Sequence, residues 1–297
     1  MKLFDIPIPH SLKSDKVGYS FLSWAAGQSI ILSNHNIIVD FEVCSFIEGN
    51  LCAVLGNILE GLSERGNQIS IVNVRIQVLR VLARNSFLEK FGYAYYVPKF
   101  YLTSIEYKKF NLQEETAAKN FFDSELFGKD GMPKMSDAAK KAILRNIFEI
   151  CVNAITHAGC EFVYCCGQVF TSKQDPRVKI SFVDLGNTIK ANVNNHLKSN
   201  LTGNEAINWA LKEGNTTKAG SEPGGLGLKL LQDLIYYNKG KLQIISGNGF
   251  VEIHDRNVIS IGQEVDFPGT IVTIELKLGD PFFYVLSTEP QNTTNIF

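Results

Sequence analysis

The stretch Glu149-Ile150-Cys151-Val152-Asn153-Ala154-Ile155-Thr156-His157-Ala158 closes a long amphipathic helix. Ser136 is a suitable N-cap for this helix, and Gly159 is suited to end it. From Ile143 onward, apolar residues recur at the spacing that packs one helix face on a sheet. The arc left over carries a narrow polar line of Asn146, Glu149, Asn153 and His157.

Glu149 and Asn153 are one helical turn apart and suit metal–phosphate chemistry. The amide oxygen of Asn153 is a hard, neutral ligand for Mg²⁺, a cation that also binds substrate phosphates. The carboxylate of Glu149 is suited to orient or deprotonate a water aimed at a terminal phosphate. Taken alone, the pair is a common chance spacing and is better explained as an ordinary solvated helix face.

Three later segments extend this pattern. The alternating strand 178–183 runs into Asp184-Leu185-Gly186, where a carboxylate can accept a hydrogen bond from an amino group on a flat ring, and glycine permits close approach. The turn Gly224-Gly225-Leu226-Gly227-Leu228 opens a helix and offers backbone N–H groups to phosphate. Gly269-Thr270 leads into the alternating strand 271–276. Each segment alone also fits an ordinary turn.

In this order the four segments resemble the ATP-binding domain of the GHKL superfamily, shared by DNA gyrase, ninety-kilodalton heat-shock chaperones, sensor histidine kinases and MutL. The resemblance covers Ser136 to Leu278 and implies a Bergerat-type α/β sandwich, in which one face of an antiparallel-to-mixed sheet is exposed. It implies that Asn153 holds Mg²⁺, that Glu149 is the general base and that Asp184 binds adenine near Thr270. Residues 187–222 would form a lid. The implied nucleotide-binding residues are Asn153, Asp184, Gly186, Gly224, Gly225, Leu226, Gly227, Leu228 and Thr270.

Two positions depart from the family pattern. Thr188 stands where a second glycine often follows the aspartate motif, which alters the rim of the adenine pocket. Pro223 stands where the glycine-rich turn would begin, and proline has no backbone N–H to give to phosphate. Both departures predict a modest nucleotide affinity.

The first third of the chain alternates strands with helices, which predicts a parallel sheet. Strands are expected at 37–41 and 69–74, and helices at 51–62 and 78–88. The segment from Ile30 to Phe91 resembles a STAS domain, the small α/β fold of anti-sigma-factor antagonists. Asn50 stands where that family carries a phosphorylated serine, so the resemblance implies a docking or sensing module without this switch. A plain packing domain is the alternative.

Composition excludes several classes of protein. The 297 residues are 45% hydrophobic and 20% charged, and the net charge of −1 argues against nucleic-acid binding through bulk charge. No apolar run approaches the roughly 18 residues of a membrane span, and the start lacks the apolar region of a signal peptide. The six cysteines show neither CxxC nor zinc-finger spacing, which favours reduced thiols in a cytoplasmic protein.

These features together predict a two-domain α/β protein: a STAS-like domain at 1–105, a connecting segment at 106–135, an ATPase domain at 136–280 and a tail at 281–297. The expected function is a regulatory switch that binds ATP and Mg²⁺, hydrolyses ATP slowly through Glu149, and couples its nucleotide state to the STAS-like domain or to a protein partner bound there. Two alternatives stay open, an anti-sigma-factor-like serine/threonine protein kinase and a non-catalytic nucleotide-binding scaffold. A homodimer is also left open, whereas nucleic-acid and membrane partners are not expected.

Overall fold

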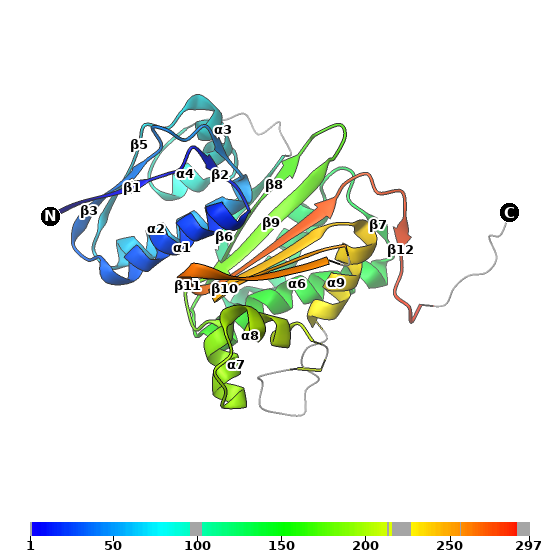
Figure 1. Cartoon of the computed structure of the whole chain (residues 1–297). Coiled ribbons are helices and arrows are strands. Elements are labelled where there is room, and N and C mark those ends of the chain that lie inside the picture. The colour runs from blue at the N-terminus through cyan, green and yellow to red at the C-terminus, as the bar shows by residue number, and fades with distance from the viewer. Residues whose placement is uncertain (1, 96–102, 213, 216–226, 256, 290–297) are drawn as a thin grey trace.

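The computed structural model describes residues 2–95, 103–212, 214–215, 227–255 and 257–289. These residues form a mixed α/β structure with two main sheets and helices packed on them (Figure 1). None of the helices within these ranges is long and apolar enough to cross a membrane.

The N-terminal third builds a small parallel sheet in the order β1-β3-β5. Helix α1 connects β1 to β3, and α2 connects β3 to β5, because parallel neighbours need a crossover connection. Two short helices follow β5. The elements are β1 (Lys2–Pro7), β2 (Ser11–Leu12), α1 (Lys16–Ile31), β3 (His35–Asp40), β4 (Phe46–Ile47), η1 (Gly49–Leu51), α2 (Cys52–Glu64), β5 (Gln68–Val72), α3 (Ile76–Arg84) and α4 (Phe87–Lys90).

The expected strands and the first expected helix of this third are confirmed as β3, β5 and α2. The helix expected at 78–88 is wrong as a single element, because Ser86 adopts a left-handed φ of +61° that separates α3 from α4. Neither β1 nor α1 was anticipated. Helix α1 is apolar almost all round and therefore shows no amphipathic stripe.

The remainder builds a five-stranded antiparallel sheet in the order β10-β11-β9-β8-β6. A small parallel pair, β7 and β12, lies apart from it. The elements are β6 (Ser104–Phe110), η2 (Leu112–Glu114), α5 (Glu115–Phe122), η3 (Asp123–Phe127), β7 (Lys134–Met135), α6 (Asp137–Ala158), β8 (Val163–Phe170), β9 (Arg177–Asp184), α7 (Ile189–Leu197), α8 (Gly203–Ala210), α9 (Gly227–Asn238), β10 (Lys241–His254), β11 (Asn257–Lys277) and β12 (Phe283–Tyr284).

Helix α6 begins and ends where the sequence predicts. The Ser136 hydroxyl accepts the backbone N–H of Ala139 at 3.1 Å and so caps the first turn. Gly159 has a φ of +72°, a conformation that costs glycine little and ends the helix.

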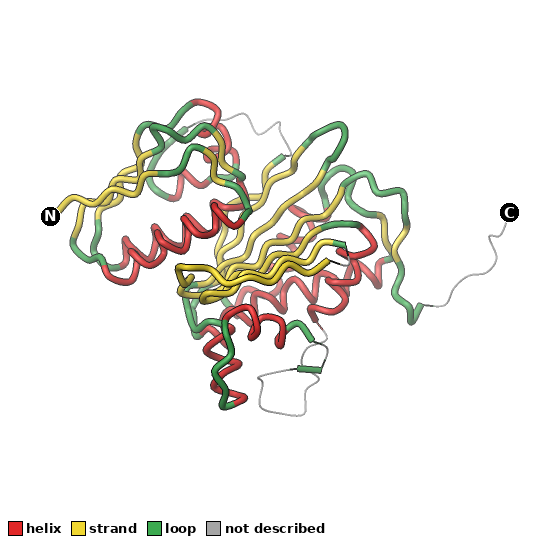
Figure 2. Tube along the Cα trace, in the orientation of Figure 1, coloured by secondary structure: helices red, strands yellow, loops and turns green. Residues whose placement is uncertain are grey.

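Both faces of the five-stranded sheet are covered (Figure 2). Helices α6 and α9 cover one face, and α1 and α2 pack on the other. The expectation of one exposed sheet face is therefore wrong. The alternating polar residues Lys179, Ser181 and Thr273 do not face water but α1 and the turn before α2.

Their contacts form a buried network, the polar junction, between the N-terminal third and the large sheet. Asn50 donates to Ser181 at 2.8 Å, Ser181 lies 2.7 Å from Thr273, and Thr273 lies 2.8 Å from the Tyr19 hydroxyl. Beside this chain, the ammonium of Lys179 pairs with Glu48 at 3.0 Å and with Glu275 at 3.1 Å. The polar junction consists of Ser14, Tyr19, Glu48, Asn50, Lys179, Ser181, Gln243, Thr273 and Glu275.

A second cluster fixes α2 on the sheet nearer to its edge. Glu60 accepts hydrogen bonds from the Tyr107 and Tyr164 hydroxyls at 2.8 and 3.1 Å and pairs with Lys109 at 2.7 Å. A Cβ at Gly56 would lie 2.4 Å from the Tyr107 ring, so this helix approaches the sheet too closely for a larger residue. The N-terminal third and the large sheet therefore share one core and two sets of polar contacts.

Candidate functional site

Asp184 and Thr270 lie side by side at one corner of the large sheet. Asp184 is the last residue of β9 and pairs in register with Thr270 of β11. Phe182 is two residues before Asp184 and Val272 is two residues after Thr270, and both belong to the core beneath α6. Since side chains alternate along a strand, Asp184 and Thr270 also face the α6 side. A Cβ at Gly269 would lie 2.0 Å from the Asp184 carbonyl oxygen, which explains a glycine before Thr270.

The Asp184 carboxyl is 2% exposed and has no ion-pair partner among the described residues. Burial raises its pKa well above the usual value, and hydrogen bonds from the backbone of Gly186 and Thr270 offset this only in part. The Cys160 thiol lies 3.9 Å from Oδ1, and burial together with the nearby carboxylate raises the pKa of that thiol to about 12. The corner thus presents a buried carboxyl surrounded by uncharged donors.

The end of α6 is held against the turn that follows β9. The Asn187 N–H donates to the Ala158 carbonyl at 2.8 Å. A Cβ at Gly186 would lie 2.4 Å from both that carbonyl oxygen and the Cys160 sulfur. Glycine is therefore required here by close approach, and the predicted helix motif and aspartate motif meet at this point.

Thr270 is also linked to the segment after the aspartate motif. Its hydroxyl lies 2.9 Å from that of Ser246 in β10, and Ser246 accepts the Ile189 N–H at the start of α7. Thr188 has a φ of −73° and caps α7 by accepting the Ala191 N–H at 3.1 Å. The departure from glycine at Thr188 therefore has a local structural reason.

Two residues of the polar line of α6, Asn146 and Asn153, can be placed relative to the neighbouring helices. On the opposite flank, the ammonium of Lys119 in α5 lies 5.2 Å from the centre of the Phe148 ring. At about 100° per residue, Asn153 lies about 140° around the helix from Phe148 and Asn146 about 160° from it. Helix α9 packs beside α6 on the side of β10 and β11, away from α5 (Figure 1). Asn146 and Asn153 therefore lie on the flank next to α9.

The start of α9 lies near the level of Asn153 along the sheet. Asn238, at the end of α9, bonds to Lys277, which pairs with Arg177 at the start of β9. From that level, β9 rises about 23 Å to Asp184, and α9 extends back about 16 Å to Gly227. Helix α6 runs antiparallel to α9 and ends at Ala158, beside the turn after Asp184, and Asn153 is about 7.5 Å before Ala158 along this helix. Measured from the level of Arg177, Asn153 therefore lies at about 16 Å, as does Gly227. The two residues are within about one helical turn of the same level.

The structure brings together one part of the predicted site and does not describe another. Asp184, Gly186 and Thr270 form the corner, Glu149 and Asn153 lie on the adjoining helix, and Gly227 and Leu228 are the first residues of α9. Outside the described residues lie Gly224, Gly225 and Leu226, together with Pro223 and the end of the predicted lid 187–222, namely residues 213 and 216–222. The described part of the lid segment contains α7 and α8.

Sequence reasoning missed Cys160 and Ser246, which contact Asp184 and Thr270. Cys160 could have been found from its position directly after the glycine that ends α6. No local pattern marked Ser246, because its contact depends on the pairing of β10 with β11.

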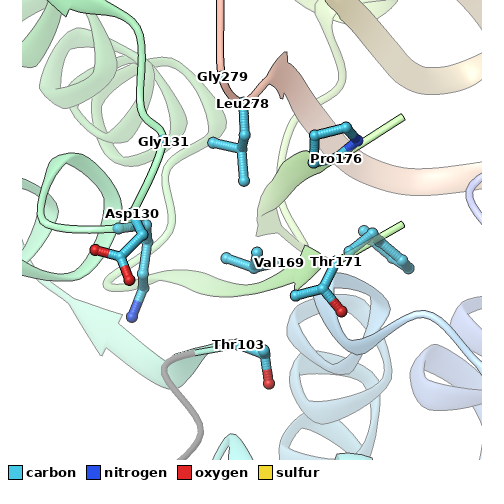
Figure 3. Close-up of a pocket in the computed structure, with 10 residues that line it drawn as sticks. Thr103, Asp130, Gly131, Val169, Thr171, Pro176, Leu278 and Gly279 are labelled. Carbon is cyan, nitrogen blue, oxygen red and sulfur yellow. The ribbon is translucent and has the colours of Figure 1, made fainter. Parts of the chain in front are cut away.

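No group of three or more His, Cys, Asp or Glu side chains suited to a metal occurs within the described ranges. A pocket of about 540 Å³ lies elsewhere, near the start of β9 and the end of β11 (Figure 3). Val169, Pro176 and Leu278 line it. It is about 23 Å along β9 from Asp184 and contains none of the predicted site residues.

No family model matches the sequence, and no curated protein is significantly similar to it.

Proposed function

We propose that this chain is a regulatory switch that binds ATP with Mg²⁺ at the corner formed by Asp184, Gly186 and Thr270 and along the adjoining flank of α6. One observation carries the proposal: Asp184, a buried carboxyl with no cationic partner among the described residues, ends β9 and pairs in register with Thr270, and the turn that follows it contacts the end of the helix that bears Glu149 and Asn153. The helix motif, the aspartate motif and the Gly269-Thr270 motif supply these residues, whereas most of the glycine-rich motif lies outside the described residues. The chemistry of each position fits one part of a purine nucleotide.

The residues present suit the nucleotide and its metal. Asp184 would accept a hydrogen bond from the adenine amino group, and Gly186 leaves space beside it. Asn153 would hold Mg²⁺ through its amide oxygen, with the nucleotide phosphates as further ligands, and this needs no cluster of carboxylates. Bound Mg²⁺ would neutralise phosphate charge, while Glu149 would orient or deprotonate the attacking water. The N-terminus of α9, near Asn153, would favour the phosphates.

The finer fold assignment belongs to this proposal. The three-stranded parallel sheet with α1 and α2 supports a STAS-like domain at 1–105. Strands β8 to β11 under α6 and α9 support a Bergerat-type domain at 136–280, to whose sheet β6 adds an edge strand from the preceding segment. Six unpaired cysteines support a reducing, cytoplasmic setting.

Coupling to the N-terminal third would run through two strands. Ser181 is three residues before Asp184 in β9, and Thr273 is three residues after Thr270 in β11. Both side chains belong to the polar junction, so movement of the corner on nucleotide binding would act on the contacts of Tyr19 and Asn50.

Asn50 bears on the kinase alternative. It is fully buried and bonded to Ser14 and Ser181, so the turn that carries the phosphorylated serine in STAS domains is closed against the chain's own sheet. Phosphorylation in cis at this turn is therefore disfavoured on accessibility as well as on residue type. A protein kinase acting on a separate partner is left as an outcome of the test.

Calorimetry with ATP, in the presence and absence of Mg²⁺, tests the proposal. The wild-type chain should bind ATP, and Asp184→Asn should weaken binding about tenfold or more. The matched control Asp266→Asn, an exposed carboxylate four residues before Thr270, should leave affinity unchanged. A wild-type chain that binds no ATP under either condition refutes the proposal.

Phosphate release separates the remaining alternatives. Glu149→Gln should keep ATP binding and lose slow phosphate release. Label from γ-labelled ATP that appears on an added protein instead of as free phosphate would identify a kinase. Binding without either product would identify a scaffold.

A further inference from the structure

The hydroxyl of Ser246 is fully buried, and its hydrogen-bonding capacity is used completely. Its single proton is donated to the Gly269 carbonyl oxygen at 2.8 Å. Its oxygen accepts the Ile189 N–H at 2.9 Å and lies 2.9 Å from the Thr270 hydroxyl. Because the Ser246 proton is already given to Gly269, the proton between the two hydroxyls must come from Thr270. The Thr270 hydroxyl therefore directs its only proton at Ser246.

Ser246, Thr270 and Asp184 form one row across three strands of the large sheet. Ser246 of β10 pairs in register with Thr270 of β11, which pairs in register with Asp184 of β9. Side chains in register on neighbouring strands point to the same face, so all three lie on the α6 side of the sheet. The row runs from a buried hydroxyl, through the half-buried Thr270, to the buried carboxyl of the proposed purine site.

The direction of the Thr270 proton decides what this row offers to a purine. With that proton turned to Ser246, the Thr270 oxygen has only lone pairs for a ligand and can only accept a hydrogen bond. An exocyclic amino group has N–H donors for such an oxygen, whereas a ring carbonyl at the same position has none. Asp184 does not make this distinction by itself, because burial raises its pKa and a protonated carboxyl donates as well as accepts.

We propose that Ser246 is a positioning residue that makes the site select a purine with a 6-amino group over one with a 6-oxo group, by holding the Thr270 hydroxyl as an acceptor. This inference rests on the proposed function and names the residue that sets its base specificity. Ser246 is fully buried and acts through Thr270 instead of touching the nucleotide. Without the Ser246 hydroxyl, the Thr270 hydroxyl is free to turn and donate to a 6-oxo group.

Calorimetric titration with ATP and with ITP, whose base carries a 6-oxo group in place of the 6-amino group, tests this inference. The wild-type chain should bind ATP at least tenfold more tightly than ITP, because ITP leaves an acceptor unpaired at Thr270. Ser246→Ala should lower the ratio of ATP to ITP affinity about tenfold. Ser246→Thr keeps the hydroxyl and should retain the wild-type ratio.

Ser260→Ala is the matched control. The Ser260 hydroxyl of β11 accepts a hydrogen bond from Asn208 at 2.7 Å, so it anchors α8 as Ser246 anchors the start of α7. Its loss should loosen that anchor without changing nucleotide preference. If Ser246→Ala fails to fold, Ser246→Cys replaces it, because a thiol still donates to Gly269 but is a weak acceptor for Thr270, and the ratio should again fall.

The outcomes separate this inference from the proposed function. An unchanged ratio in a folded Ser246→Ala or Ser246→Cys chain, with wild-type ATP binding intact, overturns the inference alone. An equal fall in Ser260→Ala, or equal affinities of the wild-type chain for ATP and ITP, also overturns it. A wild-type chain that binds neither nucleotide overturns the proposed function as well.

Discussion

Tyr19 allows a quantitative test of how the N-terminal third is held on the large sheet. Its buried hydroxyl donates to Oε1 of Gln243 at 3.0 Å and lies 2.8 Å from Oγ1 of Thr273. Since this hydroxyl has one proton, Thr273 must donate to Tyr19, and Ser181 in turn donates to Thr273 at 2.7 Å. Tyr19→Phe therefore leaves an acceptor on Gln243 and a donor on Thr273 unpaired in a buried site.

The expected cost follows from those lost partners. A buried polar group that loses its partner costs about 1–3 kcal/mol, so Tyr19→Phe should lower the free energy of unfolding by about 2 kcal/mol. Thr273→Val keeps the side-chain shape and should cost a similar amount. Because both changes remove the same hydrogen bond, the double variant should cost about 1 kcal/mol less than the sum. Burial raises the pKa of Tyr19 above its usual value, so the effect should not vary across neutral pH.

Urea denaturation measures this cycle. The fluorescence of Trp24 in α1 and of Trp209 in α8 reports on opposite parts of the molecule. Coincident unfolding curves from the two tryptophans would establish a single transition. Tyr237→Phe, at a tyrosine that is 63% exposed, is the control and should stay within about 0.5 kcal/mol of wild type. Additivity of the two variants within about 0.3 kcal/mol, or a Tyr19→Phe effect equal to the control, would refute the hydrogen-bond chain.

Three further predictions concern the candidate site. Gly186→Ala should lower the melting temperature and abolish ATP binding, because its Cβ would lie 2.4 Å from the Ala158 carbonyl oxygen. The control Gly61→Ala, whose Cβ would make only ordinary contacts, should do neither. Equal melting temperatures and equal ATP binding for the two variants would contradict the proposed site at Asp184, Gly186 and Thr270. Because the pKa of Asp184 is raised, the folded state keeps its proton longer than the unfolded state, and stability should fall as pH rises above 3.8, by at most about 1.4 kcal/mol per pH unit. The difference between wild type and Asp184→Asn in denaturation at successive pH values measures this slope, and a flat difference would contradict it. Cys160, with a pKa of about 12, should react with iodoacetamide at a rate that climbs through pH 9 without a plateau, whereas a plateau near pH 8–9 would show an ordinary thiol.

Much of the site could be predicted because its signals are local. The Ser136 cap, the apolar face and Gly159 together define α6, and each acts within a turn or two of the chain. Asp184 and Gly269 follow the same logic, since a carboxylate at a strand end and a glycine before a strand are visible in the sequence. The level of Gly227 beside Asn153 could not be predicted, because it depends on where α9 and β9 are aligned by Lys277 and Asn238.

The amino-acid sequence alone was sufficient to specify which segments become helices and strands around Asn153 and Asp184, since caps, periodicity and glycines act over short distances. It was not sufficient to show what covers the second face of the large sheet. Alternating polar residues such as Lys179, Ser181 and Thr273 give the same sequence pattern whether their side chains face water or a polar partner in the protein. Tertiary packing resolves that choice: Tyr19, Glu48 and Asn50 supply the hydrogen bonds and charge that water would otherwise provide, and the face is buried.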